Sequence, residues 1–391
     1  MTTELVERVR RRLVSAGAAV TPARVVDAVR AEAGGVVGDA DLLGALRTLH
    51  QEFVGAGPVE PLLRDPDTTD VLVTGPDQVW VDGGRGLRRA QVRFPDEEAV
   101  RRLAQRLALA AGRRLDDAQP YVDAWLPGSG PHGRIRMHAI LPPLAADGTC
   151  LSLRVLRPAD HDLVALVELG TFDAAMAELL TAMVRARLAF LVVGGTGTGK
   201  TTLLAALLGQ VQPEHRIICV EEAGELQPAH PQVVRLVARP ANIEGVGEVT
   251  VRDLVRQALR MRPDRLVVGE VRGAEVCELL AALNTGHDGG AGTLHANSPG
   301  EVPARLEALA SLGGLSRTAL HSQLAPAVRV VLHMARRTDG RRVLAEIGVL
   351  ESVSGIVRVV PAWRPAGPLP GWPRLMALLG ERQAGGGVAS C

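Results

Sequence analysis

A glycine-rich stretch near the middle of the 391-residue chain constrains the fold more than any other feature. Residues 188–193 form an apolar run that is typical of a buried parallel strand. The run leads into the motif Gly-x-x-x-x-Gly-Lys-Thr at residues 194–201, and leucines at helical spacing follow it. A strand, a glycine-rich loop and a helix in this order predict a phosphate-binding loop in an α/β domain.

The composition of this loop fits the chemistry of a triphosphate. Glycines allow successive backbone N–H groups to converge on one anion, and the helix that follows adds its positive end. We expect Lys200 to hold the β- and γ-phosphates of ATP and the Thr201 hydroxyl to hold Mg²⁺. The expected nucleotide-binding residues of the loop are Gly194, Gly195, Thr196, Gly197, Thr198, Gly199, Lys200, Thr201 and Thr202. The alternative is a glycine-rich turn that binds no ligand.

Three further strand-like runs each end in a polar signature. Residues 217–220 precede a cluster of glutamates, residues 266–269 precede Glu270, and residues 291–294 precede His295. In a parallel sheet the carboxyl ends of the strands share one edge, which is where open α/β folds bind their ligands. We therefore expect these side chains to lie beside the phosphate loop.

Phosphate hydrolysis assigns a role to each of these residues. Glu270 can hold Mg²⁺ through water, with a carboxylate at the start of a helix as the alternative. A second carboxylate must orient and deprotonate the attacking water, and Glu225 or Glu222 is the candidate. His295 can sense the γ-phosphate by hydrogen bonding, or can simply pack. Glu221 is a further candidate ligand of Mg²⁺, with a plain surface charge as the alternative.

Changes in composition and hydrophobic patterning along the chain divide it into five parts. They are an N-terminal helical segment (1–53), a small α+β domain (54–156), a linker (157–170), the domain with the phosphate loop (171–352) and a tail rich in proline and glycine (353–391). We expect most of the tail to be poorly ordered because of its composition. The expected fold is therefore an α/β protein with two domains.

Composition excludes several functional classes. The net charge of +1 and an aromatic content of 2% argue against a nucleic-acid-binding surface. The four cysteines lie far apart and form no CxxC pair, which argues against a zinc site or a disulfide framework. No apolar run is long enough to span a membrane and the N-terminus does not resemble a signal peptide, so we expect a cytoplasmic protein.

Four arginines of the α+β domain are candidates for contact with phosphate. Arg134 and Arg136 alternate with apolar residues on one expected strand, and Arg154 and Arg157 lie where this domain ends. An arginine supplied across a domain or subunit boundary can neutralise phosphate charge during transfer. The alternative is a surface arginine or a structural ion pair.

Several of these motifs together resemble a known family. The stretches GGTGTGKTT, VEEAGEL, RMRPDRLVVGEVRGAE and NTGHDGGAGTLHANSP are similar to those of the secretion ATPases of type II and type IV systems. The resemblance covers residues 55–350 and is greatest to the TadA/CpaF branch, which powers assembly of tight-adherence (Flp) pili. The tetracysteine zinc element of some type II relatives is absent, which favours the TadA/CpaF or conjugation branches.

The resemblance implies a fold, an assembly and a set of site residues. It implies a PAS-like α+β domain joined to a RecA-like ATPase domain, six copies in a ring, and ATP held between the two domains near a neighbouring subunit. It makes Glu225 the best match for the general base, Glu270 the Walker B glutamate and His295 the His-box residue. Arg134 and Arg154 match the family's phosphate-facing arginines only loosely.

The sequence thus predicts an Mg²⁺-dependent ATPase that acts on an inner-membrane platform and drives pilus assembly or secretion. It would be cytoplasmic or peripheral at the inner face of the membrane. Family members often carry Glu-Asp where this chain has Glu221-Glu222, so the role of Glu222 stays open. The alternatives are a conjugative DNA-transfer ATPase of the same fold, a nucleic-acid-translocating RecA-type motor, and a nucleotide-binding switch without catalysis.

Overall fold

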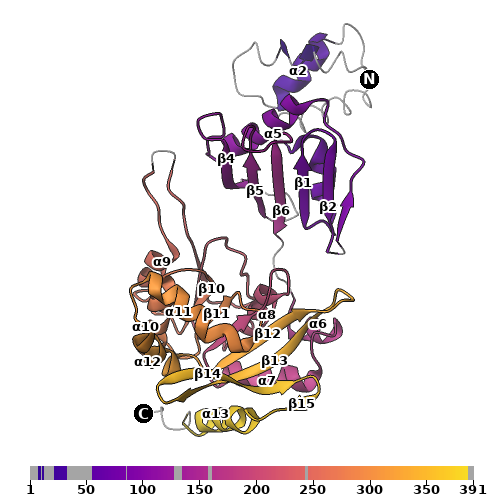
Figure 1. The fold of residues 1–391 in the computed structure, drawn as a ribbon. Helices are drawn as coiled ribbons and strands as arrows, with labels where there is room; N and C mark the ends of the chain where they lie inside the picture. The colour runs from indigo at the N-terminus through magenta and orange to yellow at the C-terminus, as the bar shows by residue number, and fades with distance from the viewer. Residues whose placement is uncertain are drawn as a thin grey trace. The chain divides into compact units, whose positions relative to one another are not determined.

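The computed structural model divides the chain into two compact units, Met1–Arg157 and Pro158–Cys391 (Figure 1). The structure describes residues 8–9, 11–12, 22–32, 55–84, 86–126, 134–156, 161–242 and 245–385. Of the predicted N-terminal helical segment it describes mainly helix α2 (Pro22–Glu32), and the rest of that prediction lies outside the described residues.

The first unit is built on an antiparallel sheet with the strand order β3-β2-β1-β6-β5-β4. Its strands are β1 (Asp70–Thr74), β2 (Gln78–Asp82), β3 (Leu87–Arg89), β4 (Tyr121–Leu126), β5 (Arg134–Ile140) and β6 (Cys150–Leu156). Besides α2, the described helices of this unit are η1 (Gly57–Val59), α4 (Glu60–Arg64) and α5 (Glu97–Ala110). Asp96 begins α5 by accepting the Ala99 N–H at 2.7 Å. Leu103 and Leu107 of α5 pack in the core with the inward residues of the strands, such as Val71.

The second unit contains a nine-stranded sheet with the order β15-β14-β13-β12-β7-β11-β10-β8-β9. The six strands from β12 to β9 are parallel, and β13, β14 and β15 pair antiparallel at one side. The strands are β7 (Phe190–Val193), β8 (Ile217–Glu221), β9 (Val233–Val237), β10 (Arg265–Val271), β11 (Ala291–Leu294), β12 (Val330–Arg336), β13 (Arg342–Val353), β14 (Ile356–Arg364) and β15 (Gly367–Pro368).

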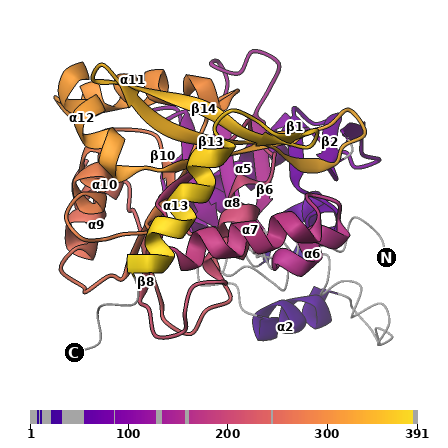
Figure 2. The same cartoon turned by 90° about the horizontal axis from the view of Figure 1, so that it is seen from below.

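Helices cover both faces of this sheet, which explains why its central strands are apolar on both sides. One face carries α6 (Leu163–Glu168), α7 (Ala174–Arg185), α8 (Lys200–Leu208) and α13 (Trp372–Gly385), of which α6, α7 and α13 stand in the foreground of Figure 2. The other face carries α9 (Val251–Ala258), α10 (Glu275–Leu283), η2 (Pro299–Glu301), α11 (Val302–Leu312) and α12 (Arg317–Ala327). Strand β7 shows the division, because Phe190 and Val192 join the first core while Leu191 and Val193 join the second.

The predicted α/β fold, with an α+β unit ahead of a P-loop domain, is confirmed. Two boundaries were wrong. The stretch 157–170, predicted as a linker, contains α6, which buries Leu163 and Leu166 in the core. The tail predicted from residue 353 contains β14, β15 and α13, because apolar side chains between its prolines and glycines pack onto the sheet. Residues 386–391 lie outside the described part.

Within the described part of the chain, no helix is both long enough and apolar enough to cross a lipid bilayer.

The packing of α13 generates a stability prediction. Leu375 is 2% exposed in the core, whereas its neighbour Met376 is 43% exposed. We expect Leu375→Ala to lower the free energy of unfolding of the second unit by about 2–5 kcal/mol, because it leaves a cavity. We expect the matched Met376→Ala to change it by less than about 0.5 kcal/mol. Denaturant unfolding of the full chain measures both, and equal small effects would show that α13 is not part of the core.

Candidate active site

The phosphate loop connects the end of β7 to the start of α8. Gly194, Gly197 and Gly199 have φ angles of 149°, 71° and 94°, which side chains with a Cβ rarely adopt. A methyl group on Gly194 would collide with the carbonyl oxygen of Met334 and lie 2.7 Å from the Thr198 hydroxyl. Residues 195–197 are exposed at the tip of the loop. Glycine is therefore required both for the path of the backbone and for its close approach to β12.

Lys200 is buried at the head of α8, with 7% of the residue exposed. Its Nζ donates hydrogen bonds to the carbonyl oxygens of Gly194 at 3.1 Å and Gly195 at 2.9 Å. Burial lowers the pKa of Lys200, while the charges of Glu270 and Glu225 act in the opposite direction. The hydrogen bonds that this ammonium makes within the described residues go to carbonyl oxygens. A cation held in this way, beside an exposed loop at a helix N-terminus, is suited to receive an anion.

Glu270 lies on β10 between two basic side chains. Its Oε1 is 2.5 Å from Nε2 of His295, which follows β11, and its Oε2 is 2.5 Å from Nη2 of Arg272. Arg272 also pairs with Glu222, at 3.0 Å. Burial and the nearby charge of Lys200 lower the pKa of His295, while the charge of Glu270 acts in the opposite direction. The parallel sheet thus brings together residues that are far apart in the sequence.

Glu221 has surroundings that differ from those expected of a magnesium ligand. The residue is 5% exposed, and its Oε1 accepts the backbone N–H groups of Glu225 and Leu226, both at 3.0 Å. A methyl group on Gly269 of the neighbouring strand would lie 2.5 Å from its Cγ. Burial raises the pKa of Glu221. Its carboxyl group therefore fixes the turn after β8, which makes it a positioning residue.

The same turn presents the two candidate bases. Glu225 is partly buried, its N–H is held by Glu221, and its charge acts on Lys200. Glu222 is exposed and paired with Arg272. Of the two, Glu225 is the one whose backbone is fixed near the phosphate loop.

The structure thus brings Lys200, Glu225, Glu270 and His295 to one edge of the sheet. Thr201 and Thr202 occupy the first turn of α8 and are partly buried.

The two arginines predicted to face phosphate have partners inside the first unit. Arg154 Nε is 2.8 Å from Oδ1 of Asp70. The guanidinium of Arg134 lies 5.0 Å from the centre of the Trp125 ring, which is a cation–π distance. A role for Arg134 or Arg154 at the phosphates stays a prediction.

Sequence reasoning missed Arg272, which links Glu222 to Glu270. Arg272 lies just past the end of β10 at Val271, two positions after Glu270, and its pairing with Glu270 and Glu222 depends on the path of the chain after the strand.

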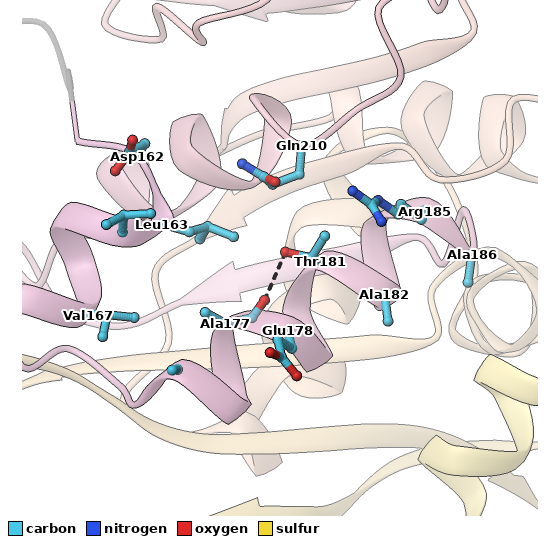
Figure 3. A pocket seen from close by; sticks show the side chains of 12 residues that line it. Asp162, Leu163, Val167, Ala177, Glu178, Thr181, Ala182, Arg185, Ala186 and Gln210 are labelled. Carbon is cyan, nitrogen blue, oxygen red and sulfur yellow. Dashed lines mark hydrogen bonds between the residues drawn. The ribbon is translucent and has the colours of Figure 1, made fainter.

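A large cavity lies away from these residues. Its volume is about 890 Å³, and Figure 3 shows side chains of α6 and α7, with Gln210, around it. One lining hydroxyl, that of Thr181, is already bonded to the Ala177 carbonyl oxygen at 2.8 Å. None of the lining residues belongs to the phosphate loop or to the acidic cluster, so we do not assign the nucleotide to this cavity.

The burial of Glu221 predicts a pH effect on stability. Its pKa is raised from 4.5 in the folded chain, so the folded state binds the proton more tightly than the unfolded state. This group's contribution to stability is therefore lost as the pH rises from about 4.5 through the raised pKa. Glu221→Gln keeps an oxygen for the two N–H groups and removes the titration. We expect the wild type to lose stability relative to this variant as the pH rises through that window.

Denaturant unfolding at several pH values measures this difference, and the exposed Glu214→Gln is the matched control. A difference between wild type and Glu221→Gln that does not change with pH would contradict the assignment.

Comparison with known proteins places the chain in a family. The family described as "Type II/IV secretion system protein" matches residues 52–351. A Mycobacterium tuberculosis protein described as "Putative conjugal transfer protein" is 68% identical over 329 residues, which are 84% of this chain and 94% of that protein. The "Probable conjugal transfer protein TrbB" of Sinorhizobium fredii is 30% identical over 75% of this chain and 86% of its own length.

Among solved structures, the Legionella pneumophila ATPase DotB is similar with a TM-score of 0.52 at 20% identity, over 72% of this chain and 76% of that one, which supports the fold. The family match confirms the predicted resemblance to the type II/IV secretion proteins. The chain belongs to the type II/IV secretion system protein family.

Proposed function

We propose that this chain hydrolyses Mg²⁺-bound ATP at the edge of its parallel sheet and uses the energy to drive a pilus-assembly or secretion machine. One observation carries the proposal. The buried ammonium of Lys200 is held by two carbonyl oxygens of the loop, and the charges of Glu270 on β10 and Glu225 in the turn after β8 act on it. This set of groups can bind the β- and γ-phosphates and activate water beside them.

The donor set fits magnesium. A threonine hydroxyl at the start of α8 and the Glu270 carboxylate supply the oxygen ligands that Mg²⁺ prefers, with water completing its shell. The bound ion neutralises negative charge on the phosphates. Glu221 is left out of this set, because the residue is buried and its Oε1 accepts two backbone N–H groups of the turn.

Glu225 is the proposed general base. It orients a water molecule in line with the γ-phosphate and takes its proton as the new P–O bond forms. The turn that carries Glu225 is anchored by Glu221. Glu225 therefore needs little movement to reach its reactive position. Lys200 balances the charge on the departing phosphate oxygen. His295, which contacts Glu270, donates a ring N–H to an oxygen of the γ-phosphate.

The motor itself is proposed as a homohexamer that docks on inner-membrane platform proteins. The motifs shared with the TadA/CpaF branch support this reading and the role in pilus assembly. The support lies in the combination of the phosphate loop, the acidic turn and the His-box stretch in one chain.

A second candidate function, conjugative transfer, has its own support. The mycobacterial relative that is 68% identical and the TrbB protein both carry descriptions as conjugal transfer proteins. A motor of the same fold and the same chemistry would then serve DNA transfer in place of pilin assembly.

We predict that Glu225→Gln lowers the turnover of ATP about 100-fold or more and leaves ATP affinity nearly unchanged. The amide keeps the shape of the side chain but cannot accept the proton. Lys200→Ala should instead weaken ATP binding, because it removes the buried cation. Steady-state phosphate release and calorimetric ATP titration separate the two effects. The exposed Glu214→Gln should match the wild type, and near wild-type turnover of Glu225→Gln would rule out this base.

Replacement of the host gene by the Lys200→Ala allele distinguishes a role in pilus assembly from a role in DNA transfer. We expect loss of surface pilin with unchanged DNA transfer between cells, measured by immunoblot of sheared surface protein and by mating frequency. Loss of DNA transfer with normal surface pilin would contradict the pilus role and favour conjugation.

A further inference from the structure

An arginine-rich hairpin overhangs the phosphate loop on the side away from the acidic residues. Strand β12 pairs with β7 up to His333 opposite Val193, where β7 ends, and β12 continues to Arg336. The chain then turns and returns on β13 with Arg342 directly opposite Arg336. The overhang therefore runs beside the loop, which agrees with the close approach of Gly194 to the Met334 carbonyl.

The tip of this hairpin is well defined by its own hydrogen bonds. The N–H of Arg337 donates to the Arg341 carbonyl at 2.8 Å, and Gly340 has a φ of 87° that allows the tight turn. Asp339 accepts from the Arg341 backbone at 3.0 Å and from its guanidinium at 2.8 Å. The single carboxylate of the turn is thus used by Arg341.

Arg342 is the member of the hairpin that lies closest to the phosphate loop. A methyl group on Gly199 would be 3.3 Å from Cδ of Arg342, so the stem of this side chain lies against the residue that begins α8. Arg342 is exposed, and no described carboxylate forms an ion pair with it. It also faces Arg336 across the strands, and like charges in opposed positions destabilise a sheet.

The order of the strands indicates which part of a bound nucleotide would lie near Arg342. Glu270 and His295 lie on the β11–β10 side of β7, and they mark the end where the γ-phosphate reacts. The β12–β13 hairpin lies on the opposite side of β7. An extended nucleotide with its γ-phosphate at Glu270 therefore directs its nucleoside toward the hairpin.

We propose that the β12–β13 hairpin forms the nucleoside side of the site and that the Arg342 guanidinium stacks on the purine ring of bound ATP. The inference rests on the proposed function. The phosphate loop and the hairpin tip contain no aromatic residue, so the planar groups there are guanidinium groups, and that of Arg342 belongs to the side chain that lies against Gly199. Arginine stacks on aromatic faces, and lysine does not reproduce this because its charge is a compact point.

Calorimetric titration of the full chain with ATP and with inorganic tripolyphosphate, both with Mg²⁺, tests the proposal. For Arg342→Ala we expect the dissociation constant of ATP to rise about 5- to 30-fold, with that of tripolyphosphate changed less than about twofold. Arg342→Lys should bind ATP as weakly as Arg342→Ala. Arg341→Ala is the matched control, since it lies one residue away and is paired with Asp339.

The outcomes distinguish a failure of the Arg342 stacking assignment from a failure of the proposed function. Equal weakening of ATP and tripolyphosphate, unchanged ATP affinity in Arg342→Ala, or recovery in Arg342→Lys would each overturn the stacking assignment. A wild-type chain that binds neither compound, with no effect of Lys200→Ala, would overturn the proposed function itself. Unfolding midpoints equal to that of the wild type show that the variants are folded.

Discussion

The burial of Lys200 beneath its own loop is the interaction on which the rest of the site depends. The ammonium can reach the Gly194 and Gly195 carbonyl oxygens only because the backbone turns sharply between β7 and α8. That turn requires positive φ angles and leaves no space for a Cβ at Gly194. A cation that is desolvated in this way, at the positive end of a helix, attracts phosphate more strongly than an exposed lysine would.

The parallel sheet brings the acidic residues and the histidine of the site together, because it places the ends of its strands side by side. Glu221 and Glu270 lie near the ends of β8 and β10, and His295 directly follows β11. They share one edge because these strands run in one direction. The acidic residues then divide into different tasks according to burial. Glu221 is covered and holds a turn, whereas Glu225 and Glu270 remain partly open beside the loop. Burial therefore separates the positioning carboxylate from those that can meet substrate.

Much of this arrangement could be predicted from the sequence, because the local signals were strong and mutually consistent. The motif at 194–201, its flanking strand and helix, and the polar residues after the strands all predicted one edge. The task of Glu221 could not be predicted, since the direction of its side chain depends on packing against Gly269 of a neighbouring strand. Helix α13 was missed because composition outweighed the spacing of Leu375, Leu378 and Leu379, which bury onto the sheet. The approach of Arg342 to Gly199 is a contact across strands that no local pattern records.

A crystal structure of the full chain with a non-hydrolysable ATP analogue and Mn²⁺ in place of Mg²⁺ tests the central claim most directly. We predict an anomalous peak between the Thr201 hydroxyl and Glu270, phosphates on Lys200, and the Glu225 carboxylate facing the γ-phosphate. Phosphates bound elsewhere, such as in the cavity between α6 and α7, or a metal peak on Glu221, would contradict the account.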